Sequence, residues 1–164
     1  MLRKAVMITA ALTLACGAVA AGAVPSGAES GTHCTFQHVP DLKPGISYNE
    51  SSGKFVDPGG GTVECKGAVN GSGSYTDSGT YSNATCQGGG NAEGDPSFTI
   101  GSETFSDHIK IVFGKEPSTN GKGIVHATFE GDRVKGTIEL TPTKGDCISG
   151  PVTQVRGVGE FDLK

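Results

Sequence analysis

Apolar and polar residues alternate along most of this chain after residue 23, and nowhere in that part are apolar residues spaced as on a helix. The sequence holds 27 glycines and no tryptophan, and turn-forming residues separate the alternating stretches at short intervals. Short strands with frequent turns are typical of antiparallel barrels and sandwiches. We therefore predict an all-β fold, an antiparallel β-barrel of about eight strands or a β-sandwich. The barrel is favoured because closure removes exposed strand edges.

The clearest strand signal is the stretch 124–140, where two alternating runs flank the pair Gly131-Asp132. Glycine in the first central position suits a two-residue type II′ turn, which predicts that Phe129 lies opposite Val134. The apolar residues of both runs then fall on one face. This is the pattern of a half-buried hairpin.

Similar alternation predicts the other strands, and clusters of turn-forming residues predict the loops. The further predicted strands are 35–39, 62–69, 72–77, 80–86, 97–100, 105–113 and 152–163. The predicted loops are the glycine-rich stretch 88–96 and a longer connection at 115–122.

The beginning of the chain has the features of an alanine-rich signal peptide of bacterial type. Arg3 and Lys4 precede the uncharged run 5–15, and small-x-small cleavage sites end at Ala20 and Ala23. A helix that spans a bilayer needs about 20 apolar residues, so this run is too short for a stable anchor. The alternative is lipid anchoring at Cys16, whose preceding residues fit a lipobox only in part.

We accordingly predict an exported, extracellular protein with three parts. Residues 1–23 form the signal peptide, 24–33 a flexible tail without periodicity, and 34–164 a single all-β domain.

Four cysteines lie beyond the signal peptide: Cys34, Cys65, Cys86 and Cys147. They include no C-x-x-C pair, and no histidine stands at zinc-ligand spacing from them, so the pattern in an exported chain predicts two disulfides. Four cysteines allow three pairings. We expect Cys65 with Cys86 and Cys34 with Cys147, because the second pair would tie together the two ends of the domain.

Charge and motifs exclude several classes of function. With 17 acidic and 13 basic residues, the chain has a net charge of −4, which argues against binding to nucleic acid or an anionic membrane. It contains no phosphate-binding loop, no G-x-S-x-G elbow and no EF-hand loop. We therefore predict no catalytic residue, no metal ligand and no cofactor.

Without a catalytic motif, the fold class suggests a module that acts by binding. The partner would be a small apolar molecule inside the barrel, or an extracellular protein or glycan at the loops. The row of residues predicted to face inward, and to line a cavity if one exists, consists of Phe105, Asp107, Ile109, Ile111, Phe113, Val125, Phe129, Ile138 and Leu140. Asp107 breaks the apolar pattern of this row. If it is buried, its carboxyl group would have a raised pKa; the alternative is that it lies in water at the rim of the barrel.

Two alternatives use other residues of the chain. A small hydrolase or isomerase on the same barrel would use Asp107 or a histidine in a water-accessible pocket. An exported inhibitor-like factor would present the segment from Cys65 to Cys86 as a clamped loop. Its contact residues would be Tyr75 and Tyr81, because tyrosines are favoured at protein interfaces.

Overall fold

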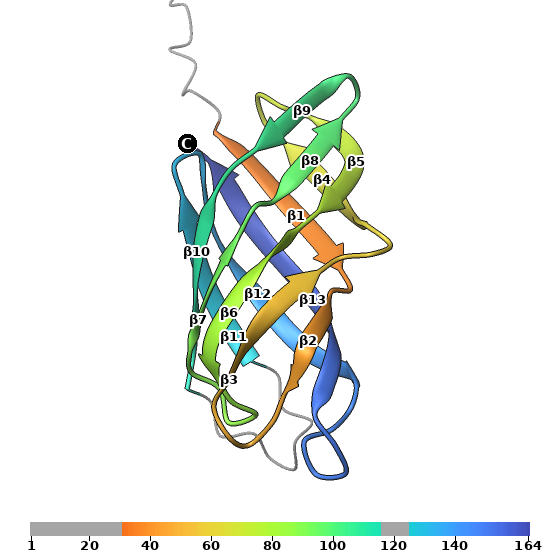
Figure 1. Cartoon of the computed structure of the whole chain (residues 1–164). Coiled ribbons are helices and arrows are strands. Elements are labelled where there is room, and N and C mark those ends of the chain that lie inside the picture. Colours follow the sequence, from red (N-terminus) through yellow and green to blue (C-terminus); the bar gives the residue numbers. More distant parts are fainter. Residues whose placement is uncertain (1–30, 116–124) are drawn as a thin grey trace, which may run out of the picture.

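The computed structural model describes residues 31–115 and 125–164, which form one antiparallel sheet of 13 strands (Figure 1). The predicted all-β class is confirmed. The strands are β1 (Thr32–His38), β2 (Asp41–Ile46), β3 (Ser51–Val56), β4 (Gly61–Lys66), β5 (Gly71–Thr76), β6 (Ser78–Ala84), β7 (Asn91–Gly94), β8 (Ser97–Ile100), β9 (Glu103–Ser106), β10 (Ile109–Phe113), β11 (Val125–Gly131), β12 (Val134–Lys144) and β13 (Val152–Leu163).

Some predictions fall outside the described residues. These are the signal peptide 1–23, the alternative lipid site Cys16, most of the tail and the loop beyond residue 115. The first strand begins at Thr32, before the predicted start of the domain at Cys34. Within the described ranges, no helix is long and apolar enough to cross a bilayer.

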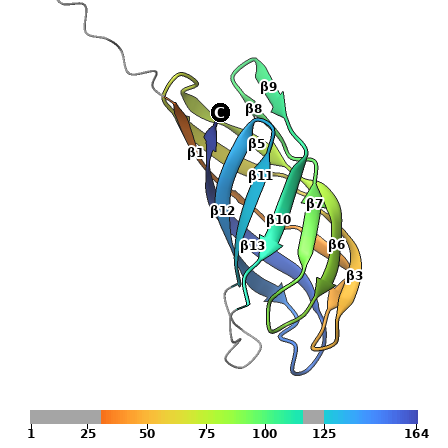
Figure 2. The same ribbon diagram turned by 90° about the vertical axis from the view of Figure 1, so that its left-hand side faces the viewer.

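The strands close into the predicted barrel. Its wall follows the order β12, β11, β10, β7, β6, β3, β2 and β13, and β13 pairs back with β12. The closing pair runs from Val134 opposite Leu163 to Lys144 opposite Gln154. Figure 2 shows β12, β11, β10, β7 and β6 side by side along this wall.

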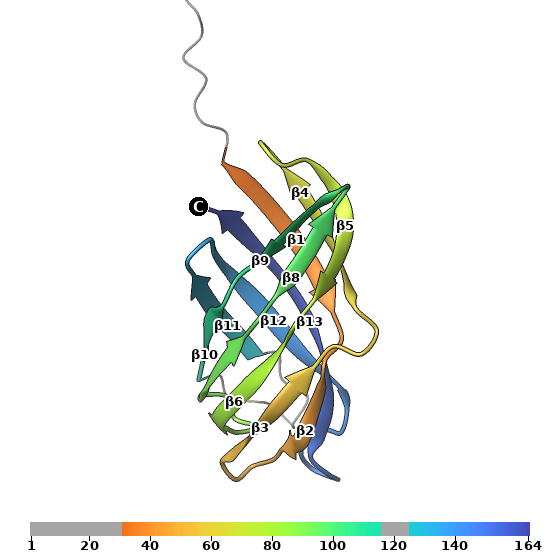
Figure 3. The same cartoon turned by 45° about the horizontal axis from the view of Figure 1, so that its top comes forward.

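Five strands extend the sheet beyond the closed barrel, in the order β1, β4, β5, β8 and β9 from β13 outward. We call them the upper extension, because β4, β5, β8 and β9 lie towards the top of Figure 1 and in the upper part of Figure 3, and β1 runs beside the upper half of β13. Strand β1 attaches to β13, from Thr32 opposite Leu163 to His38 opposite Gly157. The C-terminal strand therefore belongs to both parts of the sheet.

Each strand of the upper extension continues into a barrel strand across a short break. We call these breaks, at residues 39–40, 57–60, 77, 95–96 and 107–108, the belt. Backbone hydrogen bonds join neighbouring breaks, for example from Asp57 N to Asp77 O at 3.0 Å. Three breaks contain a proline, which has no N–H to donate to a ladder, and four contain an aspartate, which favours turns. Local sequence therefore interrupts the strands at one level.

Above the belt the interior is tightly packed. The Phe36 ring stacks on Tyr75 at 4.6 Å between centroids and meets Phe161 at 5.9 Å, and Phe98 stacks on Phe105 at 5.1 Å. Such aromatic pairs contribute about 0.5–1.5 kcal/mol each beyond the area they bury. The Cys34–Cys65 disulfide lies in this core, with both cysteines fully buried.

The predicted disulfide pairing is wrong. The bonds join Cys34 with Cys65 and Cys86 with Cys147. Cys34 and Cys65 are directly opposite each other on the adjacent strands β1 and β4, with Cα atoms 4.0 Å apart. Which strands become neighbours decides the pairing, and the spacing of cysteines along the chain does not contain that information.

The predicted hairpin at 124–140 forms with a different register. Phe129 lies opposite Gly136 rather than Val134, a shift of two residues that leaves the apolar residues on one face. Gly131 is not among the residues with positive φ, so the type II′ turn does not form there. The turn lies at residues 132–133 instead, where a remote carboxylate, Asp107, holds it.

Two other strand predictions need correction. The continuous strand predicted at 105–113 is interrupted at Asp107 and His108, which separate β9 from β10. The glycine-rich loop predicted at 88–96 contains β7, whose Ala92 is buried between Tyr81 of β6 and Ile111 of β10. In both cases pairing with neighbouring strands outweighs local composition.

Candidate functional site

The barrel below the belt encloses a cavity. It offers about 110 Å³ to the centres of water-sized molecules, enough for more than one water. Its lining is almost entirely apolar. The residues that line it are His38, Pro40, Leu42, Ile46, Phe55, Asp77, Tyr81, Ala84, Thr85, Cys86, Gly88, Gly89, Ala92, Ile111, Phe113, Val125, Ile138, Leu140, Pro142, Cys147, Val152 and Val155.

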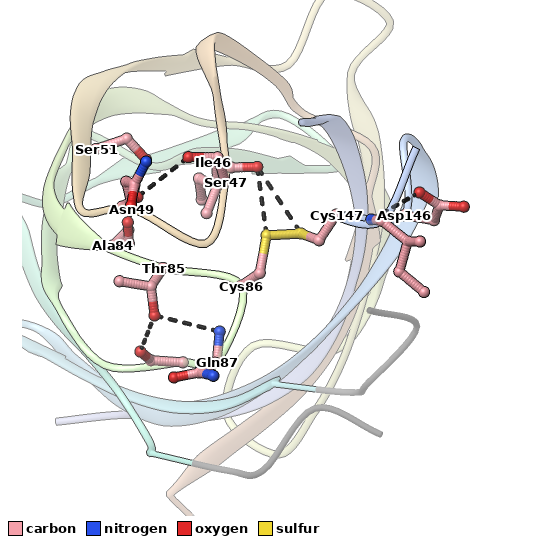
Figure 4. Close-up of a disulfide and its surroundings, with 12 residues drawn as sticks. Ile46, Ser47, Asn49, Ser51, Ala84, Thr85, Cys86, Gln87, Asp146 and Cys147 are labelled. Atoms are coloured by element: carbon pink, nitrogen blue, oxygen red, sulfur yellow. Dashed lines mark hydrogen bonds between the residues drawn. A yellow bond between two sulfur atoms is a disulfide. The ribbon is translucent and has the colours of Figure 1, made fainter. Parts of the chain in front are cut away.

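Cross-linked loops border the lower end of this cavity. The Cys86–Cys147 disulfide joins the β6–β7 loop to the β12–β13 loop, and both sulfur atoms lie near the carbonyl oxygen of Ile46, at 3.5 and 3.9 Å (Figure 4). Thr85 Oγ1 donates to Gly88 O at 2.8 Å within the first of these loops. The disulfide fixes the distance between two loops that are far apart in the sequence.

At its upper end, the cavity meets polar side chains from the belt and from the strand end next to it. His38, the last residue of β1, is 95% buried, and its Nδ1 lies 3.6 Å from Asp57 Oδ2. Neither ring nitrogen makes a hydrogen bond with the protein. Burial lowers the pKa of His38 from 6.5 to about 4, so the imidazole is neutral at pH 7.

Asp57, whose carboxyl group contacts His38, is also buried. Desolvation raises the pKa of its carboxyl group, and three nearby backbone N–H groups partly oppose this effect. The residue does not line the cavity itself. Its carboxyl group nevertheless adds to the negative potential around the imidazole.

Asp77 provides the carboxyl group that reaches the cavity. It occupies the break between β5 and β6 and is 6% exposed. Its Oδ2 accepts a long hydrogen bond of 3.4 Å from the Tyr75 hydroxyl, whereas Oδ1 has no hydrogen-bond partner. Burial raises the pKa of Asp77 from 3.8 to about 7, so near neutral pH the group is close to half ionised.

Two glycines leave the space that these polar side chains occupy. A Cβ on Gly157 of β13 would lie 2.6 Å from His38 Nε2, and one on Gly94 of β7 would lie 2.9 Å from Asp77 Oδ1. Both distances are shorter than real contacts. The backbone of the neighbouring strands therefore packs directly against the imidazole and the carboxyl group.

Of the residues predicted to line a cavity, the structure brings five to this one: Ile111, Phe113, Val125, Ile138 and Leu140. The other four do not line it: Phe105, Asp107, Ile109 and Phe129. Ile109 and Phe129 are buried in the core, and Phe105 packs against it. The predicted inward row is interrupted at Asp107, and only its lower part faces the hollow.

Asp107 holds the hairpin turn of β11 and β12. Its carboxylate accepts backbone N–H groups from His108, Arg133 and Val134 at 2.9–3.0 Å, and from Asp132 at 3.3 Å. Desolvation alone would raise its pKa, but these four donors outweigh it and lower the pKa. Asp107 is only half-buried and has hydrogen-bond partners, so the raised pKa considered for a buried Asp107 does not apply. Neither Asp107 nor His108 lines the cavity, and the histidine that does line it is His38.

Tyr75 and Tyr81 are not loop contacts. Both side chains are buried, at 4% and 3% exposure, because they stand at inward positions of β5 and β6. Tyr81 also lines the cavity, and its hydroxyl donates to Pro44 O. The segment from Cys65 to Cys86 forms strands of the sheet, β5 in the upper extension and β6 in the barrel wall, and no bond joins those two cysteines.

Sequence reasoning missed His38, Asp57 and Asp77 as a group. Each lies at the end of a strand or in a short break, where aspartate and histidine are ordinary turn or surface residues. The only available signal was that His38 continues the inward alternation of Cys34 and Phe36. Comparison of the chain with protein-family models, curated proteins and solved structures finds no significant match.

Proposed function

We propose that this is a secreted binding protein that holds a small apolar molecule in the cavity of its barrel. The observation that supports this most directly is the cavity itself, a hollow below the belt with a nearly apolar lining and two polar side chains at one end. Small-molecule sites typically combine such a lining with a few fixed polar groups.

The distribution of packing in the molecule supports the same function. Above the belt, the aromatic cluster and the Cys34–Cys65 disulfide fill the interior, whereas the interior below it is hollow. A protein interior normally reaches the packing density of organic crystals, so an unfilled apolar space lowers stability. A ligand that fills the hollow would recover the missing contacts.

The compartment fits an extracellular binding protein. Two disulfides are typical of an oxidising environment outside the cytoplasm. The leader predicted at residues 1–23 would direct export. The Cys86–Cys147 disulfide at the lower end of the cavity would form after export.

The test is a titration of the mature protein with N-phenyl-1-naphthylamine, a neutral dye whose fluorescence rises in apolar surroundings. We expect saturable binding, and native mass spectrometry of protein from culture supernatant should show any molecule that it already carries. Ala92 is buried and lines the cavity, so Ala92→Leu should fill part of the hollow and weaken dye binding about tenfold or more.

The matched control is Ala68→Leu, which adds the same atoms at an exposed position in the β4–β5 loop. It should leave dye affinity unchanged. If the dye does not bind, or if both variants bind it as the original protein does, the proposed function is wrong.

A further inference from the structure

Resting on the binding function proposed above, we infer that the molecule held in the cavity carries a protonated amine. The ammonium group would lie against the free oxygen of Asp77 and beside the His38 ring. The apolar part would extend along the aliphatic lining towards the Cys86–Cys147 disulfide.

Two unpaired polar groups of the cavity lining are the first argument. Asp77 and His38 are 94% and 95% buried, and both belong to the lining. Asp77 Oδ1 and both nitrogens of His38 lack hydrogen-bond partners in the protein. Buried polar groups are nearly always paired, and an unpaired one costs about 1–3 kcal/mol. An ammonium group on the ligand would donate to Asp77 Oδ1 and to the one nitrogen of the neutral His38 ring that carries no proton.

The sign of the surrounding charge is the second argument. The ionisable groups around Asp77 are Tyr75 from β5, Asp57 and Asp95 from neighbouring breaks, and His38 from β1. The two aspartates are acidic, the Tyr75 hydroxyl stays neutral because burial raises its pKa, and the imidazole is neutral. In the described ranges, the ion pairs of lysine are all at the surface, and neither Asp57 nor Asp77 pairs with lysine or arginine. The upper end of the cavity therefore lacks a positive charge.

An organic cation suits this site better than a metal ion. Within the described residues, no three His, Cys, Asp or Glu side chains are grouped as a metal site requires. One carboxylate oxygen, an imidazole acceptor and an apolar cavity match an ammonium group on a hydrocarbon. Because folding has already removed water from the carboxyl group, its desolvation adds little to the cost of binding.

The test compares n-octylamine, 1-octanol and octanoate as competitors of the naphthylamine dye at pH 8. The three share one chain length and differ in the charge of the head group. A hydrogen bond between charged groups is about twice as strong as a neutral one, so we expect octylamine to bind about tenfold more tightly than octanol. Octanoate should bind most weakly. The ammonium group requires ionised Asp77, so octylamine affinity should fall about tenfold from pH 8 to pH 6 while octanol affinity stays constant.

Asp77→Asn keeps the size of the side chain and the acceptor for Tyr75 but removes the charge. It should abolish the preference for octylamine and leave octanol binding intact, which also shows that the variant is folded. Asp132→Asn, at an exposed turn position outside the cavity, is the matched control and should retain the preference.

Equal affinities for octylamine and octanol, or a preference that survives in Asp77→Asn, would overturn the inference while leaving the binding function in place. Failure of the dye and of all three competitors to bind would overturn the proposed function instead.

Discussion

Replacing Asp77 with asparagine should change how the stability of the protein depends on pH. The pKa of Asp77 is 3.8 as an ordinary carboxyl group and about 7 in the folded protein. Between these pH values the folded state binds more protons than the unfolded state, so the free energy of unfolding falls as the pH rises. The loss is complete above pH 7 and amounts to about 4 kcal/mol.

His38 acts in the opposite direction over nearly the same range. Its pKa is 6.5 when exposed and about 4 in the folded protein, so between these values the unfolded state binds more protons. Its contribution to the free energy of unfolding therefore rises with pH, by about 3 kcal/mol in all, and is lost again as the pH falls. In the original protein the two effects nearly cancel between pH 4 and 6.5.

The asparagine variant should remove this cancellation. Relative to the original protein, Asp77→Asn should gain about 4 kcal/mol between pH 4 and pH 8. Urea unfolding followed by far-ultraviolet circular dichroism measures this difference at each pH, since the chain has no tryptophan to report on unfolding. Asp132→Asn should show no such trend. A stability difference between Asp77→Asn and the original protein that stays constant from pH 4 to pH 8 would falsify the argument.

Three further substitutions probe other parts of the fold, with urea unfolding as the measurement in each case. Asp107→Ala removes the acceptor of four backbone N–H groups and should cost about 2–3 kcal/mol at pH 7; because its pKa is lowered, the cost should shrink below pH 4, and a cost independent of pH would contradict this role. Replacing both Cys86 and Cys147 with alanine opens a link between residues 61 apart and should cost about 4 kcal/mol; an unchanged midpoint would show that the loops hold their positions without it. Gly157→Ala places a Cβ 2.6 Å from His38 Nε2 and should cost about 1–3 kcal/mol, whereas a stability equal to the original would mean that the imidazole can move away.

Strand patterns in the sequence predicted most of the wall of this barrel. The last strand, 152–163, has the predicted bounds, as does 97–100, because alternation and flanking turns define both locally. The register of the β11–β12 hairpin was off by two residues, since Asp107, 25 residues away from the turn, fixes it. The residues around the turn contain no signal of an acceptor that lies so far away in the sequence.

The candidate site was much harder to predict than the wall. Alternation identified the five aliphatic and aromatic lining residues from β10, β11 and β12, but it could not show where packing stops and the hollow begins. His38 comes from the end of β1, Asp57 and Asp77 come from two separate breaks, and the three approach one another only because β1, β4 and β5 are neighbours in the sheet. The disulfide pairing has the same origin, because Cys86 and Cys147 lie in loops whose proximity depends on closure.

Strand β13 holds the ends of the meander together, because it pairs with β12 on one side and with β1 and β2 on the other. Thr32 and Leu163, partners in the β1–β13 ladder, are separated by nearly the whole described chain. While a chain of this topology is being synthesised from its N-terminus, both flanks of the sheet stay open until β13 is complete. The β13 ladders that close the barrel are thus the last that can form. Contacts as distant in sequence as those of the β1–β13 ladder also form slowly. During that interval the open strands are the part of the chain that other polypeptides can pair with.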